Sequence, residues 1–210
     1  MNRNDPDRPA TSAELADIDF HSPGRFEINN PSAAPTPPEQ WSSASFLLGS
    51  LSSPAQAFNS AVEARQHTLA LIEQARRSLS IYTQDLEPWL YDHSIIQRAC
   101  AHFLLAHPRN RLRILIGDSS RAVKQGHRLV TLARRLTSNL AIRKFHPDHP
   151  TQTCAFLIAD DCGLLVRPEP DQFAGHALYR DPGRARQRQR LFDTAWDHSL
   201  PDPELRSFLL

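Results

Sequence analysis

The sequence has few of the features that mark a secreted, membrane or disulfide-bonded protein. It contains three cysteines, Cys100, Cys154 and Cys162, and no CxxC pair. An odd number of cysteines without metal-ligand spacing predicts free thiols and a reducing compartment. The first ten residues are polar and contain no apolar stretch of the signal-peptide type, and no apolar run is long enough to span a membrane. We therefore expect a cytoplasmic protein that does not bind membranes.

Glycine and lysine are also scarce. The seven glycines form no glycine-rich phosphate loop and no GxSxG nucleophile elbow. Only Lys124 and Lys144 are lysines, and the net charge of +1 falls short of the strong basicity of a dedicated nucleic-acid binder. His146, Asp148 and His149 lie in a proline-rich loop with no further ligand pair nearby, whereas zinc needs three or four ligands. These absences predict no cofactor, no metal site and no complete catalytic motif.

Proline divides the chain into two parts. Eight of the 17 prolines lie in the first 54 residues, and residues 1–52 hold three arginines against seven acidic residues. Around residues 30–38 the sequence is a low-complexity segment that cannot bury enough apolar surface to offset the entropy of ordering it. We predict a disordered, acidic, Pro/Ser-rich tail over residues 1–45 and a single α/β domain over residues 46–210.

From residue 60 onward, helical and strand patterns alternate. Apolar residues recur at helical spacing in four segments: 61–77, 88–107, 121–137 and 183–198. Short apolar or alternating runs predict strands at 79–83, 112–116, 140–145, 155–159, 164–167 and 176–179, with a hairpin turn at 160–163. Strands separated by helices favour parallel pairing, and the hairpin adds antiparallel strands. The expected fold class is α/β, with a single mixed β-sheet flanked by helices.

The hairpin carries a family resemblance. It reads Phe156-Leu157-Ile158-Ala159-Asp160-Asp161-Cys162-Gly163-Leu164-Leu165-Val166 and is followed by Ala177-Leu178-Tyr179-Arg180-Asp181. A strand ending in Asp, a turn and a second strand, placed after two βα units, resembles the half-module of the phospholipase D-like superfamily. The resemblance covers residues 60–200 and implies that superfamily's fold. Because active members pair two such halves, it also implies a homodimer or another protein partner.

The catalytic motif of that superfamily is missing. Active members use His-x-Lys followed by Asp after a four-residue gap, the His as nucleophile and the Lys as a phosphate ligand. Two registers are available for the His and Lys positions: Thr153 and Ala155 before Asp160, or Cys154 and Phe156 before Asp161. Neither supplies an imidazole or an ammonium group. The resemblance therefore implies the fold without the activity, and we predict no catalytic residues and a role as an interaction or regulatory module.

A second hypothesis rests on the predicted helix 121–137. At 100° per residue its apolar side chains fall on one arc, and four basic residues fall on the opposite arc: Arg121, Lys124, Arg128 and Arg135. Such a stripe can neutralise the phosphates of a nucleic acid, although a solvated helix face has the same pattern. Gly126 lies in the apolar arc, which predicts a close approach of this helix to the sheet.

A third hypothesis is an enzyme with a divergent site near Tyr82, Asp118 and His127. Tyr82 ends one predicted strand, and Asp118 and Ser119 follow the next. In open α/β sheets ligands bind beyond the carboxyl ends of the strands, where helix N-termini attract anions. His127 borders the apolar arc of the helix that follows. A simple helix cap explains Asp118 and Ser119 equally well.

Overall fold

The computed structural model describes residues 41–49, 54–146, 148 and 154–205. Residues 1–40, which make up most of the predicted tail, lie outside this description. Trp41, the first described residue, is buried, so packed residues occur before the predicted domain start at residue 46. None of the described helices is long and apolar enough to cross a membrane.

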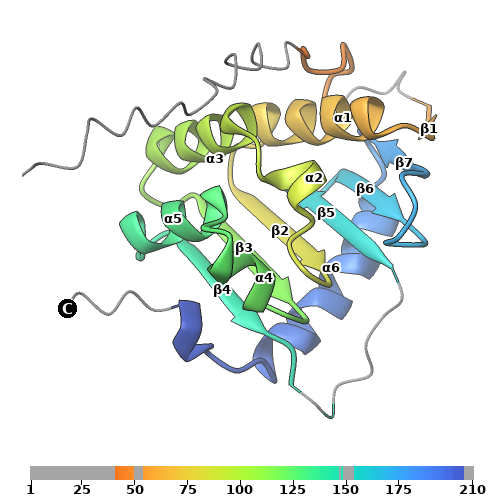
Figure 1. The fold of residues 1–210 in the computed structure, drawn as a ribbon. Helices are drawn as coiled ribbons and strands as arrows, with labels where there is room; N and C mark the ends of the chain where they lie inside the picture. The colour runs from red at the N-terminus through yellow and green to blue at the C-terminus, as the bar shows by residue number, and fades with distance from the viewer. Residues whose placement is uncertain (1–40, 50–53, 147, 149–153, 206–210) are drawn as a thin grey trace, which may run out of the picture. The chain divides into compact units, whose positions relative to one another are not determined.

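A mixed β-sheet forms the centre of the fold (Figure 1). The described strands are β1 (Gln56–Phe58), β2 (Ser78–Thr83), β3 (Arg111–Ile116), β4 (Leu140–Lys144), β5 (Ala155–Ala159), β6 (Gly163–Arg167) and β7 (Gly175–Leu178). They follow the order β1-β7-β6-β5-β2-β3-β4. The neighbours β2, β3 and β4 are parallel, and all other neighbours are antiparallel. The mixed sheet predicted from the sequence is confirmed; strand β1 was missed, since three residues leave too little alternation to detect.

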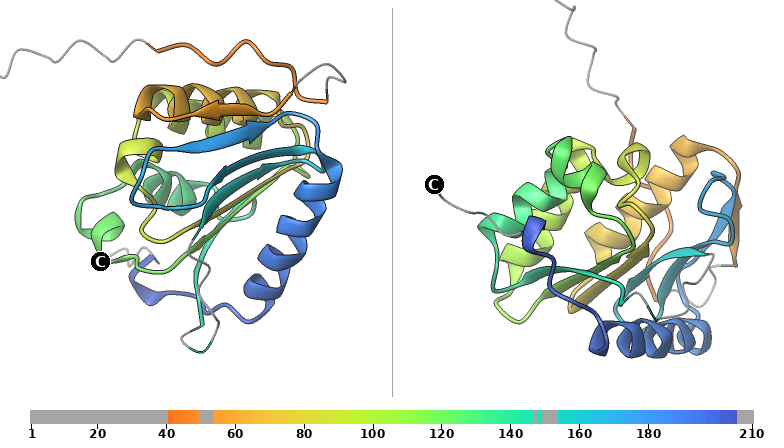
Figure 2. Two further views of the ribbon diagram at one scale, coloured as in Figure 1. Left: turned by 90° about the vertical axis from the view of Figure 1, so that its right-hand side faces the viewer. Right: turned by 60° about the horizontal axis from the view of Figure 1, so that its bottom comes forward.

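Helices cover both faces of this sheet. The described ones are α1 (Ala61–Gln74), α2 (Pro88–Tyr91), α3 (Ser94–Ala106), α4 (Ser120–Lys124), α5 (Arg128–Arg135) and α6 (Pro182–Asp197), followed by a short 3-10 turn, η1 (Pro203–Leu205). Figure 2 shows α6 on one face and the other helices on the opposite face. Strand alternation sends Leu79 and Ile81 into the core under α1 and α3, whereas Tyr82 packs with Phe192 of α6 in a second core.

The predicted helix 121–137 is wrong as a single helix. It is divided into α4 and α5 at Gly126, whose φ of 67° lies in the left-handed region that favours glycine. His127 then caps α5 by accepting a hydrogen bond at Nδ1 from the backbone N–H of Leu129, at 3.1 Å. Apart from Gly126 itself and its chain neighbours, no atom lies within 4 Å of the place where a Cβ on Gly126 would stand, so the predicted close approach to the sheet is also wrong. Glycine is favoured at this position because the backbone has a left-handed conformation.

The predicted helix 88–107 is divided in the same way. It forms α2 and α3, with Asp92 and His93 between them. The ring nitrogen Nε2 of His93 lies 2.8 Å from the carbonyl oxygen of Trp89. The other predicted helices and strands agree with the structure to within about three residues at each end, which is the usual uncertainty of helix and strand boundaries.

Candidate functional site

The three residues of the divergent-enzyme hypothesis lie in different environments. Tyr82 is buried in the core under α6, where its ring stacks on Phe156 with the two ring centroids 4.8 Å apart. His127 caps α5, which covers the opposite face of the sheet. Asp118 is exposed, and its carboxylate accepts a hydrogen bond from the backbone N–H of Ser120 at 3.0 Å. The fold therefore places Tyr82 and His127 on opposite faces, so these residues do not line one common cleft.

His127 and Ser119 are both occupied by structural contacts. Burial lowers the pKa of His127 to about 4, so its imidazole is neutral near pH 7. The hydroxyl group of Ser119 is buried and donates a hydrogen bond to the carboxylate of Asp202, which lies just before η1. The contact joins the carboxyl end of β3 to the C-terminal part of the described chain. Neither side chain is presented to solvent.

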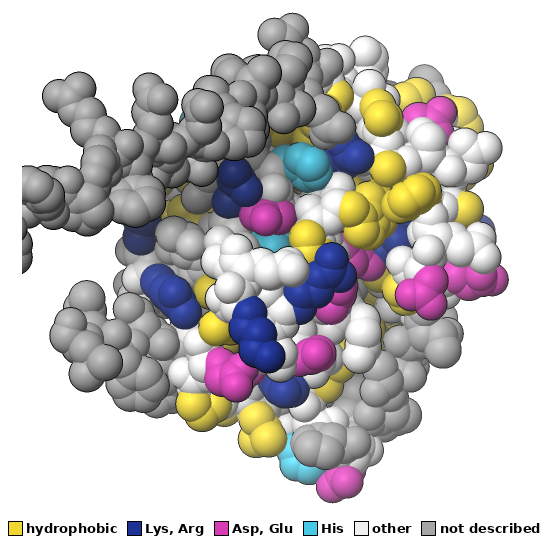
Figure 3. All heavy atoms as spheres, viewed as in Figure 1, with side chains coloured by type: hydrophobic (Ala, Val, Ile, Leu, Met, Phe, Trp, Pro, Cys, Tyr) yellow, Lys and Arg dark blue, Asp and Glu magenta, His cyan; other side chains and the backbone are white. Residues whose placement is uncertain are grey.

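The four basic residues of the second hypothesis do not share one helix face. Arg121 pairs with Asp85 at 3.2 Å, and Arg128 pairs with Asp92 at 3.2 Å. Lys124 ends α4 and Arg135 ends α5. On the side shown in Figure 3, the lysine and arginine side chains of the described residues are interspersed with acidic ones and form no continuous basic surface among themselves. Nucleic-acid binding by this segment stays a prediction. Two of its four basic side chains already form ion pairs with carboxylates.

The positions expected for the His and Lys of the superfamily lie at and just before the start of β5. Strand β5 is antiparallel to β2, with Phe156 opposite Tyr82, so the start of β5 lies beside the carboxyl end of β2. Ala155 and Phe156 are buried, and Phe156 belongs to the core under α6. Cys154 is half-buried, and Arg188 of α6 donates a hydrogen bond to its Sγ at 3.4 Å. Thr153 lies outside the described residues.

Asp160, the last residue of the motif in one register, has a local role in the turn. Its φ is 54°, in the left-handed region that Asp adopts more readily than most residues. Its carboxylate accepts hydrogen bonds from the backbone N–H groups of Arg76, Arg77 and Ser78, at 3.0, 2.8 and 3.1 Å. Asp160 therefore joins the β5–β6 hairpin to the turn between α1 and β2.

A buried ion pair lies at the carboxyl end of β2. The sequence analysis did not predict it. Arg167 ends β6, is fully buried and donates hydrogen bonds to the carboxylate of Glu87 and to the carbonyl of Gln172. Its guanidinium lies 4.8 Å from the ring centroid of Trp89. Burial lowers the pKa of Arg167 to about 10, which leaves it charged at neutral pH. Leu86 and Glu87 both have positive φ, at 64° and 36°, so the backbone is strained where it presents this carboxylate.

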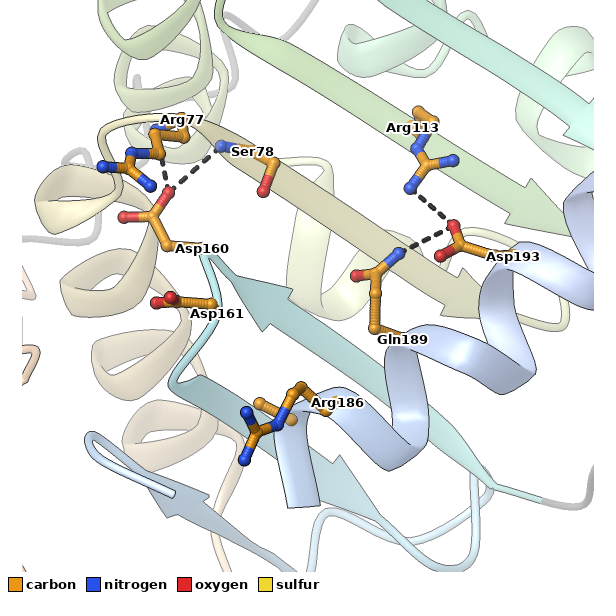
Figure 4. Close-up of a pocket in the computed structure, with 9 residues that line it drawn as sticks. Arg77, Ser78, Arg113, Asp160, Asp161, Arg186, Gln189 and Asp193 are labelled. Carbon is orange, nitrogen blue, oxygen red and sulfur yellow. Dashed lines mark hydrogen bonds and ion pairs between the residues drawn. The ribbon is translucent and has the colours of Figure 1, made fainter. Parts of the chain in front are cut away.

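A polar cavity lies at the other end of the sheet (Figure 4). This α6 cavity has a volume of 360 Å³ and is lined by Arg77, Ser78, Arg113, Asp160, Asp161, Ala185, Arg186, Gln189 and Asp193. Inside it, Asp193 of α6 accepts hydrogen bonds from Arg113 at 2.8 Å and from Gln189 at 2.9 Å. Three carboxylates and three guanidinium groups thus share the walls, so their charges balance.

A second hollow of 550 Å³ adjoins the α6 cavity. It shares Arg77, Ser78 and Arg113 with that cavity and is further lined by Arg109, Arg111, Leu112, Thr137, Ser138, Asn139, Leu140, Ala141 and Trp196. The sequence does carry a signal for it. Arg109, Arg111 and Arg113 alternate at the start of a strand, which places Arg111 and Arg113 on one face. No group of three or more potential metal ligands occurs in the described part of the chain; His149 lies outside it.

The sequence profile of one family, described as "Domain of unknown function (DUF7931)", matches residues 60–208. The chain belongs to the DUF7931 family. The match runs from the residue before α1 to beyond η1, and so includes the sheet except β1 and all of the described helices. No curated protein matches this DUF7931 chain by sequence.

Solved structures of phospholipase D family members have a similar fold. Nuc from Salmonella typhimurium, a phospholipase D family member, is 15% identical with a TM-score of 0.50, over 73% of this chain and 97% of that one. NucT from Helicobacter pylori is 13% identical with a TM-score of 0.54, over 71% and 99%. The archaeal chromatin protein TrmBL2, described with a novel mode of DNA binding, is 9% identical with a TM-score of 0.52, over 71% of this chain and 54% of its own. At these identities the likeness concerns the fold, and the DUF7931 domain is phospholipase D-like in architecture.

Proposed function

We propose that this DUF7931 domain is a non-catalytic phospholipase D-like module that acts by binding a partner. The observation that supports it most is the chemistry at the start of β5. Where active members of the superfamily carry Lys, one register has the buried Ala155, and the other has Phe156 stacked on Tyr82. Neither a methyl group nor a packed phenyl ring can hold phosphate oxygens, and the corresponding His positions, Thr153 and Cys154, supply no imidazole.

The surroundings of those positions support the same proposal. On the α6 face, the ring of Phe145 adds to the stack, with its centroid 4.6 Å from that of Tyr82. On the opposite face, Arg167 and Glu87 form the buried pair described above. Apolar packing and an internal ion pair thus occupy both sides of the carboxyl end of β2, where an α/β sheet would hold its ligand.

The test is a phosphodiesterase assay on the purified full chain. Substrates are bis(4-nitrophenyl) phosphate, phospholipid vesicles and single-stranded DNA, in buffer with a metal chelator. We expect no turnover above that of a buffer control. Metal-independent turnover that is abolished in Cys154→Ala or His127→Asn would contradict the proposal. Turnover that is identical in the wild type and both variants would be assigned to a contaminating nuclease.

The partner to be tested first is a second copy of the chain. Sedimentation equilibrium over a wide range of protein concentration measures this directly. A dimer that persists at low micromolar concentration supports self-association as the binding function. A monomer at all concentrations would exclude it and would leave a different molecule as the partner.

A further inference from the structure

Five arginines lie on the side of the sheet covered by α6, four of them at the amino ends of β2 and β3 and Arg143 towards the carboxyl end of β4. Arg111 and Arg113 belong to β3, Arg143 belongs to β4, and Arg77 and Arg109 lie in the loops that enter β2 and β3. Four of them line the 550 Å³ hollow, and Arg143 contacts Trp196 at its wall. This arginine pocket lies at the opposite end of β2 from the positions expected for the catalytic His and Lys of the superfamily.

The register of the sheet explains why the space is there. Arg111 lies opposite Ser78 and the next outward residue of β3, Arg113, lies opposite Ser80. Because strand residues alternate between faces, long basic side chains of β3 stand next to short hydroxyl side chains of β2 on the α6 face. Ala141 of β4 is opposite Arg113 on the other side. The small residues on both sides leave the volume that the guanidinium groups surround.

Two of these arginines are held in place by aromatic rings. The guanidinium carbon of Arg113 lies 5.0 Å from the ring centroid of Phe192 and 5.4 Å from that of Trp196, and the corresponding carbon of Arg143 lies 4.6 Å from Trp196. A guanidinium group over an aromatic ring is ordered, and its in-plane N–H donors remain directed outward. Arg111 is fixed by its own loop, where its Nη1 donates to the carbonyls of Pro108 and Asn110 at 2.7 and 2.9 Å.

The pocket holds positive charge that the described chain does not neutralise. Arg113 pairs with Asp193, but Arg77, Arg109, Arg111 and Arg143 form no ion pair with any carboxylate of the described residues. No acidic residue is among those that line the hollow. By contrast, Arg121 and Arg128 at the other end of the sheet each have a carboxylate partner. Converging like charges repel one another, and a bound anion with several oxygens relieves that repulsion.

We propose that the arginine pocket binds a small oligophosphate, that is, a nucleotide-sized molecule with two or more linked phosphate groups. A hollow of 550 Å³ has the size of a typical small-molecule site. Planar guanidinium forks bind phosphate oxygens two at a time, and the three unpaired arginines that line the hollow offset most of the charge of two linked phosphates. Ser78, Thr137 and Ser138 add hydroxyl groups at the wall. The inference does not depend on the absence of catalysis proposed above.

A long nucleic-acid strand fits the same surface less well. The adjoining α6 cavity presents Asp160, Asp161 and Asp193, which would repel the next phosphates along a strand. The ring of Trp196 is contacted by two guanidinium groups and is 9% exposed, so it offers no open face on which a base can stack. The net charge of +1 for the whole chain also gives no extended field for a polyanion.

Isothermal titration calorimetry of the full chain with inorganic triphosphate tests the proposal. The test variant is Arg109→Ser with Arg111→Ser, and the matched control is Arg121→Ser with Arg128→Ser; both remove two exposed arginines and the same charge. We expect saturable one-to-one binding to the wild type. The test variant should bind at least about tenfold more weakly, since two charge-assisted contacts are lost, and the control should stay within about twofold. Orthophosphate should bind at least about tenfold more weakly than triphosphate.

Several results would overturn the proposal. These are the absence of saturable binding, equal weakening in the test and control variants, or orthophosphate binding as tightly as triphosphate. Tighter binding of a single-stranded oligonucleotide than of triphosphate would assign the pocket to nucleic acid instead. Thermal melting of each variant checks that it folds. Should the double variant fail to fold, Arg77→Ser in the exposed loop before β2 serves in its place, with about threefold weaker binding expected.

Discussion

Replacing Asp160 tests whether this residue is part of the turn or part of a reaction. Its carboxylate is the common acceptor for the N–H groups of Arg76, Arg77 and Ser78. Asp160→Ala removes all of these bonds and puts a residue with a Cβ and no polar group into the left-handed region. Asp160→Asn keeps one oxygen, which can still accept from Arg77 and Ser78, and Asn tolerates that backbone conformation.

The expected loss in the free energy of unfolding follows from the number of these hydrogen bonds and from their exposure to water. A hydrogen bond to a charged group contributes about 1.5–3 kcal/mol when buried, but Arg76 and Arg77 are exposed, so water can replace the carboxylate at two of the three donors. The left-handed conformation costs alanine about 1 kcal/mol more. We expect Asp160→Ala to lower the free energy of unfolding by about 3 kcal/mol and Asp160→Asn by about half of that. For a domain of this size, 3 kcal/mol corresponds to a fall in Tm of about 6–12 °C.

Urea unfolding followed by circular dichroism, with Tm by calorimetry, measures these differences. Asp161→Asn is the matched control, because it removes the same charge from the adjacent, exposed residue. Its free energy of unfolding should stay within about 0.5 kcal/mol of the wild type. If Asp160→Ala is as stable as the Asp161→Asn control, the carboxylate of Asp160 does not stabilise the turn. The structural explanation for Asp160, in a chain that lacks the His and Lys of the motif, is then refuted.

Three further predictions concern the opposite end of the sheet. The free energy of unfolding of the wild type should fall as the pH drops from 6.5 towards 4, because His127 takes up a proton at its ordinary pKa in the unfolded chain but only at a pKa of about 4 when buried. His127→Asn keeps the helix cap, so its free energy of unfolding, measured with urea, should depend less on pH over this range. Glu87→Gln should cost about 3–5 kcal/mol in the same assay because it removes the carboxylate that is hydrogen-bonded to the buried Arg167, and a double change to Glu87→Met with Arg167→Met should recover most of that loss. Gly126→Ala should lower the free energy of unfolding by about 1 kcal/mol and Gly126→Asn by less, as measured by thermal melting; equal values would show that the positive φ carries no strain.

The sheet was predictable because its residues alternate or form short apolar runs. The local pattern alone predicted the strand with Leu79 and Ile81 and the hairpin around Gly163. Parallel pairing was predicted where a helix joins two strands, and antiparallel pairing where a tight turn joins them. The division at Gly126 was not predictable from periodicity. The apolar spacing continues across it, and only a positive φ shows that the glycine ends one helix before His127 caps the next.

The candidate site was less predictable than the fold. From the sequence, Tyr82 was expected at a strand end and His127 beside the apolar arc of helix 121–137, but the pattern could not tell which face of the sheet each side chain would take. The pairing of Arg167 with Glu87 joins residues 80 positions apart, so no local pattern reveals it. The alternating arginines from Arg109 to Arg113 were visible, yet their meaning depends on small neighbours in β2 and β4 that only the register brings together.

The proposed lack of catalysis predicts that no residue of this chain takes up a phosphoryl group, because Ala155 and Phe156 are packed at the start of β5. Intact-mass spectrometry of the full chain tests this directly. The protein is incubated with a phosphodiester substrate and a chelator, then quenched under alkaline conditions that preserve a phosphohistidine. We predict the unmodified mass at every time point. A time-dependent phosphoryl adduct on any residue of this chain would contradict the account.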